Sequence, residues 1–136
     1  MVEHGRGTAH RLAVAVLTVP PHTDGPPPHW HQKHDETFYV IAGTARFTVG
    51  DTQREAPAGT FVSVPTGAEH TFANAGDEPA IMLNTFTPDL YVDYFRDLST
   101  LAASGEMTPE AILGVMARYA TYPAGSPAPE STDQGA

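Results

Sequence analysis

The chain has no cysteine among its 136 residues, and this absence removes several classes of protein at once. Disulfide bonds, thiolate nucleophiles, and zinc or iron–sulfur sites held by cysteine are all excluded. Any metal ion bound by this chain must therefore be held by nitrogen and oxygen atoms. Seven histidines and sixteen acidic residues supply atoms of that kind.

Basic residues are also scarce, with seven lysines and arginines against sixteen aspartates and glutamates and a formal net charge of −9. Such a surplus of negative charge repels phosphate backbones and anionic lipid surfaces, so we expect neither nucleic acid nor a membrane as a partner. No apolar run approaches the roughly twenty residues that span a bilayer. The longest, LAVAVLTV at 12–19, ends at two prolines and is typical of a buried strand rather than a signal peptide. We expect a soluble, cytoplasmic protein.

Turn-forming residues are abundant, with thirteen prolines and twelve glycines. They separate short runs that are apolar or rich in β-branched residues. Many short strands at this spacing are typical of an all-β sandwich or barrel, and a chain of this length suffices for one such domain. The predicted strands are 12–19, 37–42, 45–49, 52–56, 60–64, 70–74 and 80–86.

The spacing of apolar side chains changes after residue 87. Thr87-Pro88-Asp89 places a hydroxyl, a proline and an acid in the order that begins many helices, and Thr108-Pro109-Glu110 repeats it. Spacings of three and four residues then give each predicted helix one apolar face. We expect both helices to pack on the β core or on a partner subunit, with a role in narrowing a pocket as the alternative. The faces consist of Tyr91, Tyr94, Phe95, Leu98, Leu101 and Ala102 in the first helix, and Ile112, Val115, Met116 and Tyr119 in the second.

These patterns divide the chain into three parts. Residues 1–87 form the predicted β domain, and residues 88–122 hold the two helices packed on it. Residues 123–136 are too poor in apolar groups to fold, so we expect a disordered tail whose removal leaves stability unchanged.

The stretch HWHQKHDE, which begins at His29, concentrates imidazoles and carboxylates. Side chains alternate along a strand, so His29 and His31 point the same way, and the turn after them brings Glu36 onto the next strand. His70 lies on a separate predicted strand. Imidazoles and a carboxylate fixed on rigid strands make a site for a first-row transition metal ion. The remaining histidines, His4, His10, His22 and His34, are expected to face water.

The spacing of these residues resembles that of the metal-binding cupins. The first motif of that family has two histidines separated by one residue, then a glutamate and a glycine. His29, His31, Glu36 and Gly43 follow it, although Gly25 lies closer to His29 than the leading glycine of the family usually does. The second motif, G-x5-P-x-G-x2-H-x3-N, is matched without a gap by Gly59, Pro65, Gly67, His70 and Asn74. The resemblance covers residues 12–87.

This resemblance implies a double-stranded β-helix, which is a jelly-roll barrel, with one divalent transition metal ion per chain inside it. His29, His31, Glu36 and His70 would be the metal ligands. The sequence leaves the metal open among iron, manganese, nickel, cobalt, copper and zinc, because imidazole and carboxylate suit all of them.

Within the family, this set of candidate ligands looks like that of the small bacterial flavonol (quercetin) 2,3-dioxygenase-like cupins. The resemblance implies that Glu36 is both a ligand and the catalytic base, taking the proton of an enolic hydroxyl before dioxygen adds. The substrate would be a small enolic or aromatic molecule of the flavonol or polyketide kind. The candidate substrate-binding residues are Phe38, Phe47 and Phe72, for which plain core is the alternative, and Asn84, which either faces solvent or offers the pocket one hydrogen bond.

Two other functions fit the same spacing. A non-oxidative polyketide cyclase or isomerase would use the metal to polarise a carbonyl group during proton transfer. A non-catalytic barrel would bind a small molecule and keep a structural metal. We also predict a homodimer that uses the strand at 12–19, because this strand is apolar on both faces and a single barrel exposes its strand edges.

Overall fold

The computed structural model describes residues 2–89 and 93–129, and this part of the chain is mostly β structure. Its strands are β1 (Ala13–Val19), β2 (Thr23–Asp24), β3 (His29–His31), β4 (Asp35–Ala42), β5 (Thr44–Val49), β6 (Thr52–Pro57), β7 (Phe61–Val64), β8 (His70–Asn74), β9 (Ala80–Thr87) and β10 (Thr121–Pro123). Its helices are the short 3-10 helix η1 (Arg6–Thr8) and the α-helices α1 (Tyr94–Ser104) and α2 (Pro109–Arg118).

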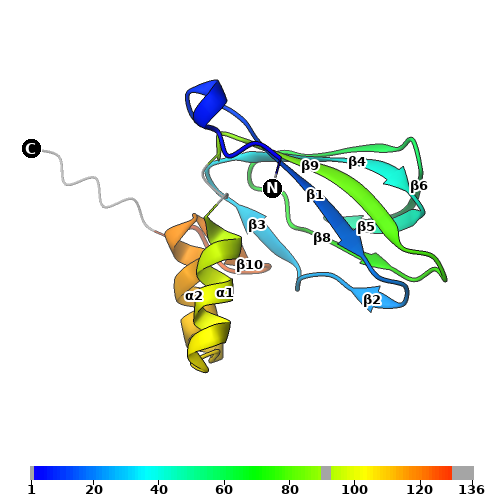
Figure 1. Cartoon of the computed structure of the whole chain (residues 1–136). Coiled ribbons are helices and arrows are strands. Elements are labelled where there is room, and N and C mark those ends of the chain that lie inside the picture. Colours follow the sequence, from blue (N-terminus) through cyan, green and yellow to red (C-terminus); the bar gives the residue numbers. More distant parts are fainter. Residues whose placement is uncertain (1, 90–92, 130–136) are drawn as a thin grey trace, which may run out of the picture.

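The strands form two antiparallel sheets that face each other (Figure 1). One sheet has the order β1-β9-β4-β7, and the other runs β10-β3-β8-β5-β6 with β2 paired to β8. Alternate residues of the strands point between the sheets and form the core, as the period of two predicts. The predicted double-stranded β-helix is confirmed. The core consists of Val19, Phe38, Val40, Ala45, Phe47, Ala56, Val64, Ala80 and Met82.

Gly43 of the first motif and Asn74 of the second stabilise the fold. Gly43 turns the chain between β4 and β5 with a positive φ of 71°, and a Cβ atom there would lie 2.2 Å from the carbonyl oxygen of Pro79. No residue but glycine fits this turn. The buried Asn74 donates to the carbonyl oxygens of Val19 and Glu78 at 3.0 and 2.8 Å. It thereby ties the end of β8 to neighbouring loops.

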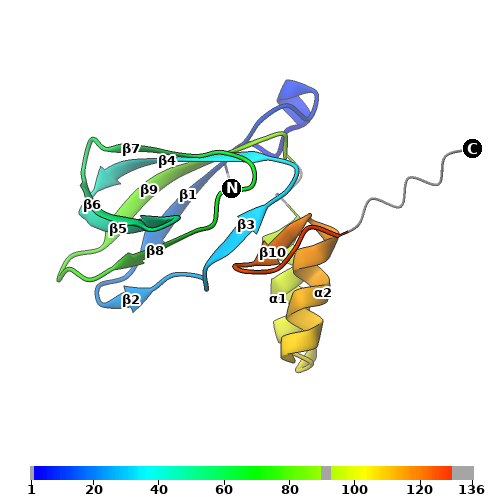
Figure 2. The ribbon, with the colours of Figure 1, turned by 180° about the vertical axis from the view of Figure 1, so that it is seen from behind.

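Helices α1 and α2 lie side by side at one end of the barrel, next to β3 and β10 (Figures 1 and 2). A second apolar cluster joins them to the barrel of their own chain. It combines Ala13, Ala15 and Phe86 from the strands with Tyr94 and Val115 from the helices. The helices therefore cover the end of the β core, as expected.

The first helix begins later than predicted. Thr87, the expected cap, extends β9 and pairs with Asp35 of β4. Because this residue belongs to the sheet, the helix starts only at Tyr94, after Asp93. Tyr91, which was expected on the apolar face of this helix, lies outside the described residues.

The second helix begins as predicted. The hydroxyl oxygen of Thr108 accepts a hydrogen bond from Ala111 N at 3.1 Å, and Pro109 occupies the first turn. Proline suits this position because the first backbone N–H groups of a helix have no partner within it. Within residues 2–89 and 93–129, no helix is long and apolar enough to cross a lipid bilayer.

The folded region extends beyond the predicted start of the tail at residue 123. Pro123 belongs to β10, which pairs antiparallel with β3. Gly125 N donates to the carboxylate of Glu69 at 2.7 Å, so the chain stays attached to the barrel after the strand. A three-residue edge strand depends on the backbone of its partner rather than on its own side-chain pattern, which is why the sequence did not reveal it. Residues 130–136 of the predicted tail lie outside the described residues.

Candidate metal centre

Four buried side chains converge between the two sheets. Strand β3 carries His29 and His31, β8 carries His70, and β4 of the opposite sheet carries Glu36. None of the four is more than 6% exposed. His29 and His70 are paired neighbours in the β3–β8 ladder, and alternation along β3 turns His31 to the same side as His29. One ligand atom from each residue lies within 4.8 Å of the other three.

Two of the imidazoles are oriented by nearby carbonyl groups. His29 Nδ1 lies 2.9 Å from the carbonyl oxygen of Pro27, and His70 Nδ1 lies 2.9 Å from that of Ala68. A carbonyl oxygen only accepts, so each Nδ1 carries a hydrogen atom. Burial, followed by the neighbouring His70, lowers the pKa of His29 to about 4. His29 is therefore neutral at pH 7 and offers the lone pair of its Nε2.

The third imidazole and the carboxylate meet at the centre of the cluster. Glu36 Oε2 lies 3.1 Å from His31 Nε2 and 2.9 Å from His70 Nε2. Burial on its own raises the pKa of Glu36, but the two imidazoles outweigh burial and hold this pKa below its usual range. Burial also lowers the pKa of His31. A neutral His31 thus faces an ionised Glu36.

This donor set fits a divalent transition metal ion. A cation at the centre of the cluster would be shared by the Nε2 atoms and the carboxylate oxygen, and it would balance the buried negative charge of Glu36. Three imidazoles and one carboxylate are ligands that first-row transition metals accept, and a hydrogen bond at Nδ1 is typical of a histidine that binds metal through Nε2. The four residues predicted from the sequence can therefore hold one metal ion.

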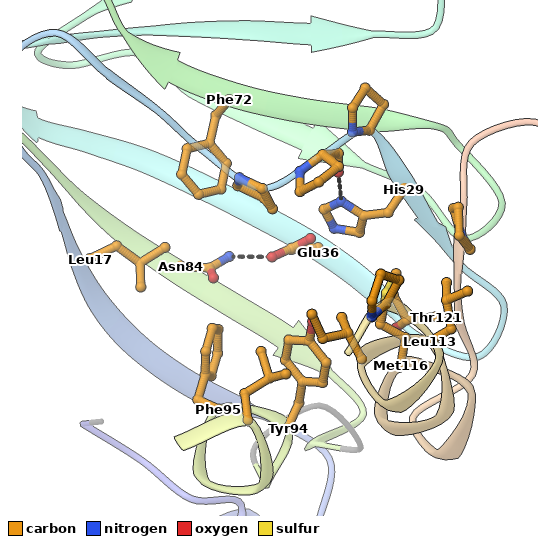
Figure 3. A pocket seen from close by; sticks show the side chains of 17 residues that line it. Leu17, His29, Glu36, Phe72, Asn84, Tyr94, Phe95, Leu113, Met116 and Thr121 are labelled. Atoms are coloured by element: carbon orange, nitrogen blue, oxygen red, sulfur yellow. Dashed lines mark hydrogen bonds between the residues drawn. The ribbon is translucent and has the colours of Figure 1, made fainter. Parts of the chain in front are cut away.

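The second oxygen of Glu36 is held by Asn84. The Nδ2 atom of Asn84 lies 3.0 Å from Glu36 Oε1 (Figure 3). It also lies 3.0 Å from the carbonyl oxygen of Thr37. Asn84 is 1% exposed, so of its two alternatives the one in which it faces solvent is excluded. Its amide instead orients the carboxylate, and the same side chain lines the neighbouring cavity.

A cavity of about 570 Å³ lies between the open end of the barrel and the helices. Glu36 and His29 line it on the barrel side, and Tyr94, Phe95 and Met116 face them from the helices (Figure 3). Among the described residues, no lysine or arginine lines this space. The rest of its wall is mainly apolar; it comes from Leu17, Phe72, Leu98, Ile112, Leu113 and the prolines Pro26, Pro27, Pro28, Pro109 and Pro123, with Asn84 and Thr121 as its polar members.

Comparison with known protein families agrees with the fold. Residues 15–86 match the family model described as the cupin domain, which is more than half of the chain. The chain belongs to the cupin family. The matched residues contain all four candidate ligands and end before α1 begins.

Individual relatives cover only part of this cupin. It is 39% identical over 70 residues to oxalate decarboxylase OxdC of Bacillus subtilis, a match that spans 48% of this chain and 18% of the decarboxylase. It is 35% identical over 96 residues to quercetin 2,3-dioxygenase of Aspergillus japonicus, spanning 65% of this chain and 27% of the dioxygenase. The chain thus spans well under a third of either curated relative.

Solved structures show the same fold. DMSP lyase DddQ of Ruegeria pomeroyi has a TM-score of 0.53 at 29% identity, with 60% of this chain and 40% of the lyase covered. A protein of Klebsiella pneumoniae with a double-stranded β-helix domain has a TM-score of 0.54 at 26% identity, with 59% of this chain and 70% of that chain covered. The cupin barrel is thus shared with proteins of different activity.

The three candidate phenylalanines of this cupin divide between cavity and core. Phe72 lines the cavity. Phe38 and Phe47 do not, and their rings pack 5.0 Å apart in the barrel core, where they are 1% and 3% exposed. Phe38 shares the inward face of β4 with Glu36 but lies two residues further along the strand, so its ring packs in the core rather than at the cavity. For Phe38 and Phe47 the structure favours the alternative of plain core.

His34 was predicted to face water, and this prediction is wrong. It is 1% exposed, and its ring centroid lies 4.1 Å from that of His31 and 5.9 Å from that of Phe86. Burial, with His31 as the next cause, lowers the pKa of His34 to about 3. The sequence did contain a signal for this. Residues 34, 36 and 38 are each two apart, so extended chain that continues back from Glu36 to residue 34 turns His34 to the same inward face. The other three histidines, His4, His10 and His22, are exposed as predicted.

Proposed function

We propose that this cupin is a metal-dependent dioxygenase that acts on a small, neutral, enolic or aromatic molecule of the flavonol or polyketide kind. The cavity carries this proposal, because it reaches Glu36 and His29 at one end and is mainly apolar elsewhere. Its volume of about 570 Å³ lies within the range of roughly 300–1,000 Å³ that is typical of small-molecule sites.

The absence of basic side chains from the described cavity wall favours neutral substrates over anionic ones. A small dianion such as oxalate would find no lysine or arginine among the described lining residues and would leave the apolar space unfilled. Burying unpaired charge is costly, whereas burying an aromatic ring beside Phe72, Phe95 and Met116 is favourable. The similarity to the quercetin dioxygenase, which covers more of this chain than the similarity to the oxalate decarboxylase, points the same way.

The residues of the site suit proton removal from an enolic hydroxyl. His29, His31, His70 and Glu36 would hold the metal ion, which when bound acts as a Lewis acid and lowers the pKa of such a hydroxyl. Glu36 is ionised and borders the cavity, so its carboxylate can accept the hydroxyl proton. Asn84 keeps Oε1 in place during this transfer. In a dioxygenase both atoms of dioxygen then enter the product.

A second candidate is proton transfer without dioxygen, as in a cyclase, isomerase or lyase. It is supported by the likeness to the DMSP lyase and by the presence of a buried carboxylate that can serve as a base in either reaction. The roles of His29, His31, His70 and Asn84 would be unchanged. The two candidates differ only in the step after deprotonation, which uses dioxygen in the first and not in the second.

Oxygen uptake by metal-loaded protein tests the proposal. The substrates are a panel of flavonols and enolic diketones, with oxalate as the anionic comparison and His70→Ala as the metal-deficient control. We expect oxygen to be consumed with a flavonol or diketone and not with oxalate. Product formation that is the same with and without oxygen would show the second candidate to be correct. Tight binding of a panel member without any turnover would instead indicate a non-catalytic binding barrel.

A further inference from the structure

The three imidazoles of the site are oriented in two different ways. His29 and His70 each donate to a carbonyl oxygen two residues earlier in the chain, so their orientation is set locally. His31 Nδ1 instead lies 2.7 Å from the hydroxyl oxygen of Thr121, which is 90 residues away in the sequence. The third ring therefore depends on the C-terminal region.

The hydrogen bonds of Thr121 decide which nitrogen of His31 carries the hydrogen atom. Thr121 is 1% exposed, and its Oγ1 donates its single hydrogen to the carbonyl oxygen of Tyr119 at 3.2 Å. The hydroxyl can then only accept from His31, so Nδ1 is the protonated nitrogen of the ring. Nε2, which faces Glu36 and the other imidazoles, then carries the lone pair.

The backbone holds Thr121 in this position. Strand β10 pairs Thr121 with His31 and Tyr122 with Trp30, and the Trp30 and Tyr122 rings pack 5.0 Å apart on the other side of the strands. A further hydrogen bond joins Gln32 N to the carbonyl oxygen of Ala120 at 2.8 Å. These contacts clamp β10 onto β3 on both sides of His31.

We propose that Thr121 is a positioning residue for His31: its hydroxyl fixes the tautomer and the ring orientation that present Nε2 to a metal ion. The inference rests on the metal site of the proposed function. It adds that a residue beyond the cupin match at 15–86, placed after the two helices, completes the surroundings of a ligand on β3. The barrel alone would orient two of its three histidines.

Metal affinity is the first measurement. Valine has nearly the shape of threonine but no hydroxyl, whereas serine keeps the hydroxyl. Loss of a hydrogen bond to the outer nitrogen of a metal-binding histidine typically lowers metal affinity by 10–100-fold. We therefore expect Thr121→Val to bind Co²⁺ or Zn²⁺ roughly 10–100-fold more weakly than the wild type, and Thr121→Ser to bind within about threefold of it.

Competition with a chromophoric chelator gives these affinities on the full-length protein. Thr100→Val is the matched control, because Thr100 is exposed on α1 and its hydroxyl donates only to a local helix carbonyl, that of Arg96. This control should bind metal like the wild type. Equal affinity of Thr121→Val and the wild type would overturn the proposal. A wild type that binds no metal would contradict the metal site itself, and the proposal would then be decided by the next measurement.

The tautomer of His31 is that second measurement, and it needs no metal. In ¹⁵N spectra of the histidine rings at pH 7, with His31 assigned by its loss in His31→Asn, we expect the Nδ1–H form in the wild type and in Thr121→Ser. In Thr121→Val the hydrogen should move to Nε2, which can donate to Glu36 Oε2 at 3.1 Å. An unchanged Nδ1–H form in a folded Thr121→Val protein, as judged by its melting curve, would show that Thr121 does not set the tautomer.

Discussion

The barrel and the C-terminal region contribute to the same cavity by different means. Residues 13–87 supply every candidate metal ligand, each placed by strand alternation and strand pairing. Residues 94–126 supply no ligand; they contribute the apolar wall of α1 and α2 and the hydroxyl of Thr121. The family match covers the first region and not the second. We infer that the reaction chemistry lies in the barrel, and that selection of the substrate lies in the region added to it.

The largest effect is expected at Glu36, on the barrel side. Glu36→Gln keeps the size of the side chain but removes the base, while three imidazoles remain to hold the metal. Turnover should therefore fall by roughly a hundredfold or more, mainly in kcat, at saturating metal. Metal content and turnover are measured on the same preparation.

His70→Ala is the comparison variant for this experiment, because it removes a neutral ligand and leaves a gap. It should lose metal and activity together. A metal-replete Glu36→Gln protein with nearly wild-type turnover would contradict the assignment of Glu36 as the base and leave it as a ligand only.

The buried His34 should make the metal-free protein sensitive to acid. The pKa of His34 is lowered from 6.5 to about 3 in the folded protein, so below pH 6.5 the unfolded chain takes up a proton that the folded chain does not. Stability should therefore fall as the pH drops from 7 to 5, by about 2 kcal/mol for this group. The lowered pKa of His29 adds to the same trend.

Chemical denaturation at pH 7 and pH 5, after treatment with a chelator, measures this loss. Glu36 does not interfere, because its lowered pKa affects stability only below its unfolded value of 4.5. His34→Leu should show a smaller difference between the two pH values than the wild type. The same pH dependence in both proteins would mean that His34 is not buried in its neutral form.

A change in the cavity wall should separate substrate binding from metal binding. Met116 lies on α2 and lines the cavity opposite Glu36 (Figure 3). Met116→Ala removes apolar contact with the bound molecule, so we expect about tenfold weaker binding of a flavonol and no change in metal affinity. Flavonol binding is followed by the fluorescence of the ligand. A parallel loss of metal affinity would show that the two regions are not separable in this way.

Two truncations test how far the C-terminal region is folded. Removal of residues 127–136 should leave the melting temperature unchanged, since this segment is poor in apolar groups. Removal of residues 123–136 also takes away Pro123 of β10 and the hydrogen bond from Gly125 to Glu69. We expect it to destabilise the protein by about 1 kcal/mol, in contrast to the expectation from composition. Identical melting temperatures for both truncations would show that residues 123–126 do not contribute to stability.

The last prediction concerns the outer face of the four-stranded sheet, where we expect two copies of the chain to associate. Val16, Leu83, Tyr39 and Phe61 are in register across the four strands, and Phe61 is 63% exposed. Asp35 is the only charged residue among the outward-facing positions of these strands. Because the chain as a whole carries a net charge of −9, two copies repel each other least across this face.

We therefore keep the prediction of a homodimer and place its contact on this face, of which the strand at 12–19 forms one side. Light scattering at micromolar concentration should give the mass of a dimer for the wild type and of a monomer for Phe61→Lys. Met107→Lys, at an exposed apolar residue between α1 and α2, is the control and should remain dimeric. A monomeric wild type would refute the prediction.

Much of the candidate site was predictable because its determinants are local. The spacing of His29, His31 and Glu36 sets the strand face on which each lies. The turn between β3 and β4 places the two histidines on one strand and Glu36 on the next. Asn84 stood out as a polar residue in an apolar strand, but the sequence left open whether it faces solvent or the pocket. The start of α1 was predicted wrongly, because a helix-start pattern at Thr87 competes with a strand pairing that the sequence does not display.

The sequence by itself determined the β-rich fold and the two helices, since these depend on periodicity and spacing within short segments. The candidate metal ligands came from the resemblance of two spaced motifs to those of the cupins. Only the tertiary structure decided that His34 is buried, that Phe72 borders the cavity while Phe38 and Phe47 fill the core, and that Thr121 reaches His31. Each of these depends on how segments far apart in the chain pack against one another. Such packing divides aromatic rings between cavity and core, or aligns a hydroxyl, without leaving a periodic trace in the sequence, because the free energy comes from the contact and not from either segment alone. For His34 a trace exists in its shared parity with Glu36, but only the packing shows that the ring is buried.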